Sequence, residues 1–190
     1  MIIDGDWGTG KTEFCFKLIN KFEADHKNYR LLYLDAFQAD HADNPLMTLL
    51  SSVMKLLPEE KTKSKLLKSA IPVVRYSLAA TGKAVVAHAL KQNADELAAG
   101  FDKAIQDAAD TAIDASLKSL LKDHEKAEEN LKALQSTLEG IAKSSPIVIF
   151  IDELDRCRPD FAVHFLETIK HTFSVEGLKF VLITNTKQLR

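Results

Sequence analysis

The 190-residue chain has no excess of positive charge and few cysteines. Its 25 Lys and Arg stand against 27 Asp and Glu, so the formal net charge is −2 and the isoelectric point is about 6.3. This balance gives no overall basic field of the kind that attracts nucleic acid. The two cysteines, Cys15 and Cys157, form no CxxC or Cys/His pattern, so neither a disulfide framework nor a zinc site is indicated. A reducing, cytoplasmic setting suits both thiols.

Long apolar runs are also missing. Acidic residues interrupt the first positions of the chain, so we expect no signal peptide there. The most apolar stretch, residues 69–90, contains Arg75, Lys83 and His88 and never reaches about 18 residues without charge. One charge at mid-span costs about 2.5–3.5 kcal/mol on insertion scales. A buried or amphipathic helix is therefore favoured over one that spans or lies on a membrane.

Apolar strands alternate with amphipathic helices at both ends of the chain. Strands are expected at residues 1–4, 29–37, 147–152 and 178–185. Because these runs are apolar throughout, the pattern predicts an α/β fold with a parallel sheet flanked by helices. The sequence begins directly in one expected strand and stops after another, so we expect a fragment of a longer protein. Residues 1–58 and 146–190 are its predicted core.

Three helices of this core have recognisable apolar faces or starts. Phe14, Leu18 and Phe22 recur at four-residue spacing in the first helix. Pro45 and Pro159 each open a further helix, since proline is well tolerated in a first helical turn.

A helical insertion is predicted at residues 59–145. Residues 59–68 are a charged linker or a helix start, and the Ala/Leu/Lys/Glu-rich tract beyond residue 90 indicates packed helices, as a hairpin or short coiled-coil pair that turns near residues 122–130. The lysines of residues 55–68 are more simply a solvated face than a direct contact with nucleic acid. The insertion is the expected surface for a second copy or a protein partner.

The octet "GDWGTGKT" fits the phosphate-loop pattern G-x-x-x-x-G-K-[ST], with a strand before it and a helix after it. Glycines let backbone N–H groups curl around a polyphosphate at the positive end of the helix. Lys11 is expected to reach the β- and γ-phosphates, and the Thr12 hydroxyl to ligate Mg²⁺. A chance glycine-rich turn would lack this strand-and-helix context. The predicted nucleotide-binding set is Gly5, Asp6, Trp7, Gly8, Thr9, Gly10, Lys11 and Thr12.

Three carboxylates lie within four positions at the end of the strand "IVIFID": Asp152, Glu153 and Asp155. Asp152 is expected to hold Mg²⁺ beside Thr12, while Glu153 faces the γ-phosphate and polarises the attacking water. Acids after a strand can instead be a solvated loop, but this is less consistent with a phosphate loop in the same chain. Asn185, at the end of the last strand, either positions the water or belongs to a turn.

Asp155 and Arg156, two and three positions after Glu153, leave three alternatives open. They orient Glu153, contact the nucleotide of a neighbouring subunit, or form a surface ion pair of little energetic weight. ATP is the expected nucleotide by default, since the guanine-reading pattern N-K-x-D is absent.

On these motifs the chain resembles the KAP family of P-loop NTPases. The resemblance rests on Trp7 within "GDWGTGKT", on "FIDELDRCRPDFAVHFLETIKHTF" and on a long helical insertion between the Walker A and Walker B motifs. It implies Mg²⁺-dependent ATP hydrolysis coupled to conformational change, in an oligomer or at a membrane, with bacterial or phage-related defence as one setting. A slow or non-catalytic nucleotide-gated switch is the alternative, and a small-molecule kinase is weaker because no lid or substrate-binding arginines are evident.

Overall fold

The computed structural model describes residues 1–42, 44–81 and 117–189. By their internal contacts they form two compact units, one of residues 1–59 with 138–190 and one of residues 60–137. The first unit contains the sheet.

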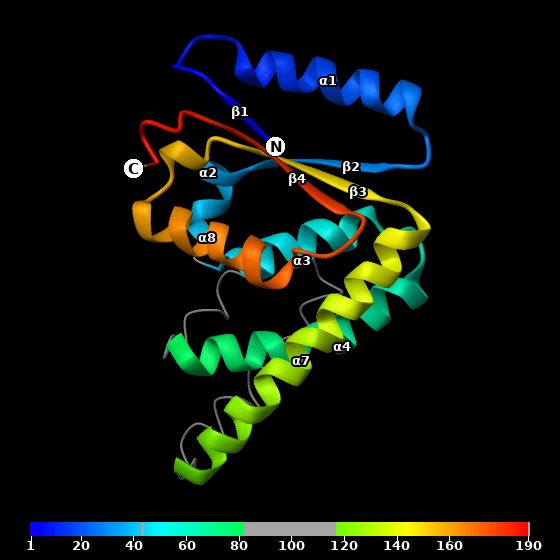
Figure 1. Ribbon diagram of the computed structural model, residues 1–190, viewed down its shortest axis with the longest axis vertical. Helices are drawn as coiled ribbons and strands as arrows, with labels where there is room; N and C mark the ends of the chain where they lie inside the picture. Colours follow the sequence, from blue (N-terminus) through cyan, green and yellow to red (C-terminus); the bar gives the residue numbers. More distant parts are fainter. Residues whose placement is uncertain (43, 82–116, 190) are drawn as a thin grey trace. The chain divides into compact units, whose positions relative to one another are not determined.

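Within the described residues, four parallel strands form one sheet in the order β1-β4-β3-β2 (Figure 1). Their bounds are Ile2–Asp4 for β1, Arg30–Asp35 for β2, Ile147–Asp152 for β3 and Leu178–Thr184 for β4. β3 is buried along its whole length because it lies between two other strands. The predicted parallel α/β sheet is therefore confirmed.

Helices cover both faces of this sheet, with α1 (Lys11–Asp25) on one face and α3 (Pro45–Leu56) and α8 (Pro159–Thr172) on the other (Figure 1). Cys15, Leu18 and Phe22 of α1 pack against Val148 and Phe150 of β3. Phe14, predicted on the apolar face, is instead 55% exposed. The buried row of α1 is set by Cys15 and continues at three- and four-residue steps, which turns Phe14 toward solvent.

Short helices, rather than an extended strand and loop, follow β2. The strand ends at Asp35, whose carboxylate accepts a hydrogen bond from the Gln38 amide at 2.9 Å and so caps α2 (Ala36–Ala39). The 3₁₀ turn η1 (Asp40–Ala42) continues from it. Pro45 opens α3 as predicted, with Asn44 as its cap.

Two long helices border the part of the insertion that the structure leaves undescribed. α4 spans Glu60–Thr81, so the charged residues 59–68 are largely a helix start. α7 spans Leu117–Ser144 without interruption, and the turn predicted near residues 122–130 is therefore wrong. The charges that suggested a turn instead include a Glu128–Lys132 pair at 2.7 Å, spaced to stabilise one helix face.

The prediction of packed helices in the insertion rests partly on apolar residues at three- and four-residue steps, and four of these lie outside the described residues: Leu97, Phe101, Ile105 and Ile113. Within the ranges that are described, no helix combines the length and apolarity needed to cross a bilayer. Residues 69–81 of the most apolar stretch lie in α4.

An ion pair between the buried Asp40 and the exposed Arg158 fixes the start of α8 against η1. Arg158 donates to Asp40 through its backbone N–H (3.0 Å to Oδ2) and its guanidinium Nε (3.0 Å to Oδ1). Burial of Asp40 acts to raise the pKa of this carboxyl, but the donors from Arg158 outweigh it and hold the pKa below the usual range. The pair anchors α8, which follows the segment of residues 153–156 after β3, called the acidic loop below.

We expect Asp40→Asn to lower the free energy of unfolding at neutral pH by about 1–3 kcal/mol, because the charge-assisted hydrogen bonds that the buried Asp40 carboxylate accepts are weakened. A depressed carboxylate pKa contributes stability that is present above the unfolded value and lost as the pH falls through the folded value. The parental stability should thus decline more steeply than that of the variant below about pH 4, the ordinary range of an aspartate. Urea unfolding at pH 7 and pH 3 measures both effects. Asp25→Asn, at an exposed surface pair, is the control, and equal acid sensitivity of Asp40→Asn and the parent would contradict the assignment.

Candidate active site

The phosphate-loop octet forms a tight loop between β1 and α1. Gly8 and Gly10 adopt left-handed backbone angles, with φ of 76° and 79°, and Gly10 caps the N-terminus of α1. At Gly5 an added Cβ would come 3.0 Å from Thr9 Oγ1, so a side chain there would crowd Thr9. The loop thereby gathers backbone around a helix N-terminus, where the helix dipole favours an anion.

Lys11 lies across the mouth of this loop. Its Nζ donates to the carbonyl of Gly5 at 2.6 Å and to that of Asp6 at 3.1 Å. Thr9 Oγ1 donates to the same Asp6 carbonyl at 2.7 Å. Backbone carbonyls of the loop thus hold the Lys11 ammonium group beside it.

The end of β3 meets the first turn of α1 at Asp152. Thr12 Oγ1 donates to Asp152 Oδ2 at 2.7 Å, between residues 140 positions apart in the sequence. Tyr33 on β2 donates its hydroxyl to the same oxygen at 3.1 Å. Asp152 is only 3% exposed. Its carboxylate is held in one orientation by the two hydrogen bonds, one from Thr12 on α1 and one from Tyr33 on β2.

Glu153 has a left-handed backbone with φ of 60°, which is unusual for a residue other than glycine. The Glu153 amide donates to Asp152 Oδ1 at 2.8 Å, and the Glu153 carboxylate pairs with Arg156 at 3.1 Å. Burial raises the pKa of Glu153; Arg156 opposes this, and the neighbouring acids Asp35, Asp152 and Asp155 add to it. Backbone strain of this kind clusters at functional sites.

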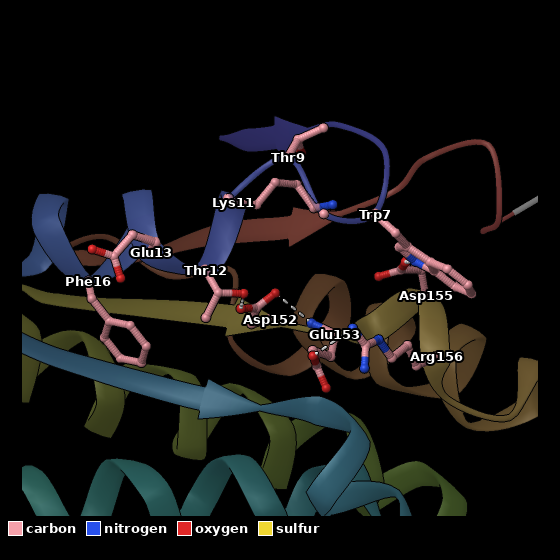
Figure 2. A pocket seen from close by; sticks show the side chains of 12 residues that line it. Trp7, Thr9, Lys11, Thr12, Glu13, Phe16, Asp152, Glu153, Asp155 and Arg156 are labelled. Atoms are coloured by element: carbon pink, nitrogen blue, oxygen red, sulfur yellow. Dashed lines mark hydrogen bonds and ion pairs between the residues drawn. The ribbon is translucent and has the colours of Figure 1, made fainter.

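A cavity of about 430 Å³ lies between the phosphate loop and the acidic loop. Figure 2 shows Thr12 and Asp152 facing one another in it, with Glu153 and Arg156 alongside. The lining residues come from the loop, the first turns of α1, and the residues that end and follow β3. They are Trp7, Gly8, Thr9, Gly10, Lys11, Thr12, Glu13, Phe16, Asp152, Glu153, Asp155 and Arg156.

A family model described as the KAP family P-loop domain matches residues 1–190, the whole chain. The chain belongs to the KAP family. No curated protein matches it. A KAP P-loop domain is a nucleotide-binding domain, which agrees with a cavity that joins a phosphate loop to a strand-end carboxylate.

Three predicted site residues of this KAP domain are not among those that line the cavity: Gly5, Asp6 and Asn185. Asn185 is 6% exposed, and its amide donates to Asp6 Oδ1 at 3.4 Å. Lys187 also pairs with Asp6 Oδ1, at 3.5 Å. The segment after β4 thus braces the phosphate loop through Asp6.

Tyr33 is a site residue of the KAP domain that sequence reasoning missed. Burial, followed by the charge of Asp152, raises the pKa of Tyr33, so its hydroxyl stays protonated as a donor. The only sequence signal was a polar aromatic four positions before the end of the strand predicted at residues 29–37. That position faces α1, where Tyr33 contacts Phe16 with ring centroids 4.7 Å apart.

The cysteines of the KAP domain are not activated nucleophiles. Burial raises the pKa of Cys15 to about 11 and that of Cys157 to about 12. Because the thiolate is the reactive form, both remain inert thiols near neutral pH.

The oxygen donors at Asp152 fit a magnesium–nucleotide complex. No group of three or more His, Cys, Asp or Glu side chains that could cage a metal is found in the described part of the chain. Mg²⁺ commonly takes one or two protein oxygens together with substrate phosphates. One buried carboxylate beside a hydroxyl, at the mouth of a phosphate loop, matches that donor set.

Proposed function

We propose that this KAP domain binds Mg²⁺–ATP and hydrolyses it with Glu153 as the residue that orients the water. The observation that carries the proposal is the 2.7 Å hydrogen bond from Thr12 Oγ1 to Asp152 Oδ2. It supports a single magnesium site made from the two motifs.

The phosphate loop and Lys11 would hold the triphosphate. The α1 N-terminus and the loop amides favour a bound anion, and Lys11, already at the loop's mouth, supplies the positive charge for the β- and γ-phosphates. Thr12 and Asp152 would hold Mg²⁺, which supplies charge neutralisation at the phosphates when bound. Tyr33 keeps the Asp152 carboxylate oriented.

Glu153 differs from Asp152 in direction and environment, as expected for a different role. It lies in the cavity wall and its side chain is 25% exposed, so it is open to the cavity, whereas Asp152 is buried. A carboxylate at this place can accept a hydrogen bond from water and align it for attack. Asn185 would act on the water only indirectly, through Asp6 and the loop.

The proposal predicts that ATP uptake depends on magnesium and on Asp152. Calorimetry should record tighter ATP binding by the parent with Mg²⁺ than with chelator. Asp152→Asn keeps the shape of the side chain but removes the metal-binding charge, so the affinity ratio with and without Mg²⁺ should fall to about 1. Asp160→Asn, at an exposed acid of α8, should keep the parental ratio. If the parent bound ATP equally well with and without Mg²⁺, the magnesium site at Asp152 would be wrong.

A nucleotide-gated switch with slow or no turnover is the second candidate. It is favoured by Arg156, the arginine among the described cavity-lining residues, whose guanidinium is paired with Glu153 instead of being free for a phosphate. Steady-state phosphate release separates the two: a switch binds Mg²⁺–ATP tightly with few or no turnovers, whereas an ATPase releases phosphate continuously.

The family resemblance also suggests what the nucleotide cycle does in the cell. We propose that the nucleotide cycle drives a conformational change, that a second copy or a protein partner engages the helical insertion, and that bacterial or phage-related defence is one setting. Size measurements with and without Mg²⁺–ATP test the oligomer.

A further inference from the structure

Trp7 is a large aromatic side chain in the phosphate loop and is 60% exposed. Its indole Nε1 donates to Asp155 Oδ2 at 3.1 Å, and the guanidinium carbon of Arg156 lies 5.8 Å from the centre of its ring. Figure 2 shows Trp7 reaching across the cavity toward Asp155 and Arg156. One residue of the phosphate loop thus contacts two residues of the acidic loop.

The two acidic-loop residues have further partners. Arg156 pairs with the carboxylate of Glu153 at 3.1 Å, while Asp155 Oδ1 accepts a hydrogen bond from Thr184 Oγ1 at 3.1 Å. Thr184 is the last residue of β4 and only 1% exposed, so Asp155 is attached to the rigid sheet. Arg156 is half exposed, which leaves its side chain freer to move than Asp155.

The backbone of Glu153 is held independently of its side chain. The Glu153 amide donates to Asp152 Oδ1 at 2.8 Å, and the Glu153 carbonyl accepts from the Arg156 amide at 3.1 Å. These contacts support the left-handed conformation, which costs of order 1–3 kcal/mol for a residue other than glycine. With the backbone fixed, the Arg156 ion pair is the contact that sets where the carboxylate points.

We propose that Trp7, Asp155 and Arg156 form a positioning relay that adjusts the Glu153 carboxylate to the conformation of the phosphate loop. An exposed ion pair alone would count for little. Here the same guanidinium also faces the Trp7 ring, and cation–π contacts contribute about 0.5–1 kcal/mol at exposed sites. The relay rests on the proposed role of Glu153, and its members are positioning residues.

Loading of the phosphate loop would then be transmitted to Glu153 in two steps. A change at the loop shifts the Trp7 ring, while Asp155 keeps the indole N–H tied to the end of β4. Arg156 follows the ring face and turns the carboxylate with it. The acid is thereby aligned when the loop is occupied.

The first test needs no turnover, because Trp7 is the one tryptophan of the chain and its emission reports on the relay. Glu153→Ala does not touch Trp7, yet it releases Arg156 and should change the accessibility of Trp7 to acrylamide. In an Arg156→Gln background the same Glu153→Ala change should have no effect. Glu139→Ala is a matched control, because Glu139 pairs with Lys143 at 2.9 Å at similar exposure. Equal quenching of the parent and Glu153→Ala would overturn the relay.

The second test measures turnover and binding in the same proteins. Misalignment of a catalytic group by about 1 Å can cost on the order of 100-fold, so Arg156→Gln should lower kcat by about 10- to 100-fold with little change in the Kd for Mg²⁺–ATP. Arg156→Lys should recover part of the rate, and Lys143→Gln should behave like the parent. An Arg156→Gln variant with parental kcat, or one that loses ATP binding instead, would contradict positioning. If the parent itself releases no phosphate, the proposed hydrolysis fails, and the quenching test still decides the relay.

Discussion

Glu153→Gln should bind Mg²⁺–ATP with an affinity within about threefold of the parent and release phosphate at least about 100-fold more slowly. The amide has the size of the carboxylate but cannot accept a proton from water. The contacts that fix this position, from the Glu153 amide to Asp152 and from the Arg156 amide to the Glu153 carbonyl, involve only the backbone of Glu153 and survive the change. Calorimetry gives the affinity, and continuous phosphate detection gives the rate.

Glu139→Gln supplies the control, since it also removes one charge from a partly exposed carboxylate–cation pair, on a helix away from the cavity. It should retain the parental rate and affinity. Parental turnover by Glu153→Gln would show that this acid has another role, and loss of binding would assign it to nucleotide affinity instead of water alignment.

Lys11→Ala should weaken the binding of Mg²⁺–ATP by about 10- to 100-fold. A hydrogen bond to a charged group contributes about 1.5–3 kcal/mol, which corresponds to that range of affinity. Lys11 already lies at the loop, with its Nζ 2.6 Å from the Gly5 carbonyl, so little rearrangement is needed to reach a phosphate. Calorimetric titration with Mg²⁺–ATP measures the change directly.

Lys17→Ala is the matched control for charge, because Lys17 lies on the same helix and pairs with Glu13 at 3.2 Å on its exposed surface. Thermal unfolding of both variants separates affinity from loss of structure. If Lys11→Ala bound Mg²⁺–ATP as tightly as Lys17→Ala, the octet would not act as a phosphate loop in this chain.

The elements of the fold that depend on local sequence were predictable, and those that depend on distant pairing were not. The all-apolar run of β3 predicted a strand buried on both faces, and Pro45 and Pro159 marked helix starts. The spatial order β1-β4-β3-β2 depends on contacts between strands far apart in the chain. The turn predicted at residues 122–130 was wrong for a local reason: a dense run of charged residues is as compatible with an exposed helix as with a loop.

The residues of the candidate site likewise fall into those that local motifs predict and those that only distant contacts bring together. Lys11, Thr12 and Asp152 belong to motifs whose spacing fixes their local geometry, and the structure brings them to one cavity. Tyr33 was missed because its contact with Asp152 comes from the register of two neighbouring strands. The bracing of Asp6 by Asn185 similarly depends on the pairing of β1 with β4. The roles assigned to these residues remain predictions.

The pairing of β1 with β4 also affects how the protein is made. Ile2 of β1 lies opposite Leu182 of β4, so the first strand gains its neighbour only after some 180 further residues have been synthesised. At about 5–20 residues per second, this takes roughly 9–36 s. Throughout that interval the nascent chain carries an unmatched strand, which a chaperone at the ribosome would be placed to shield. Because β4 lies between β1 and β3 in the sheet, the phosphate loop cannot reach its place beside Asp152 until β4 has been synthesised.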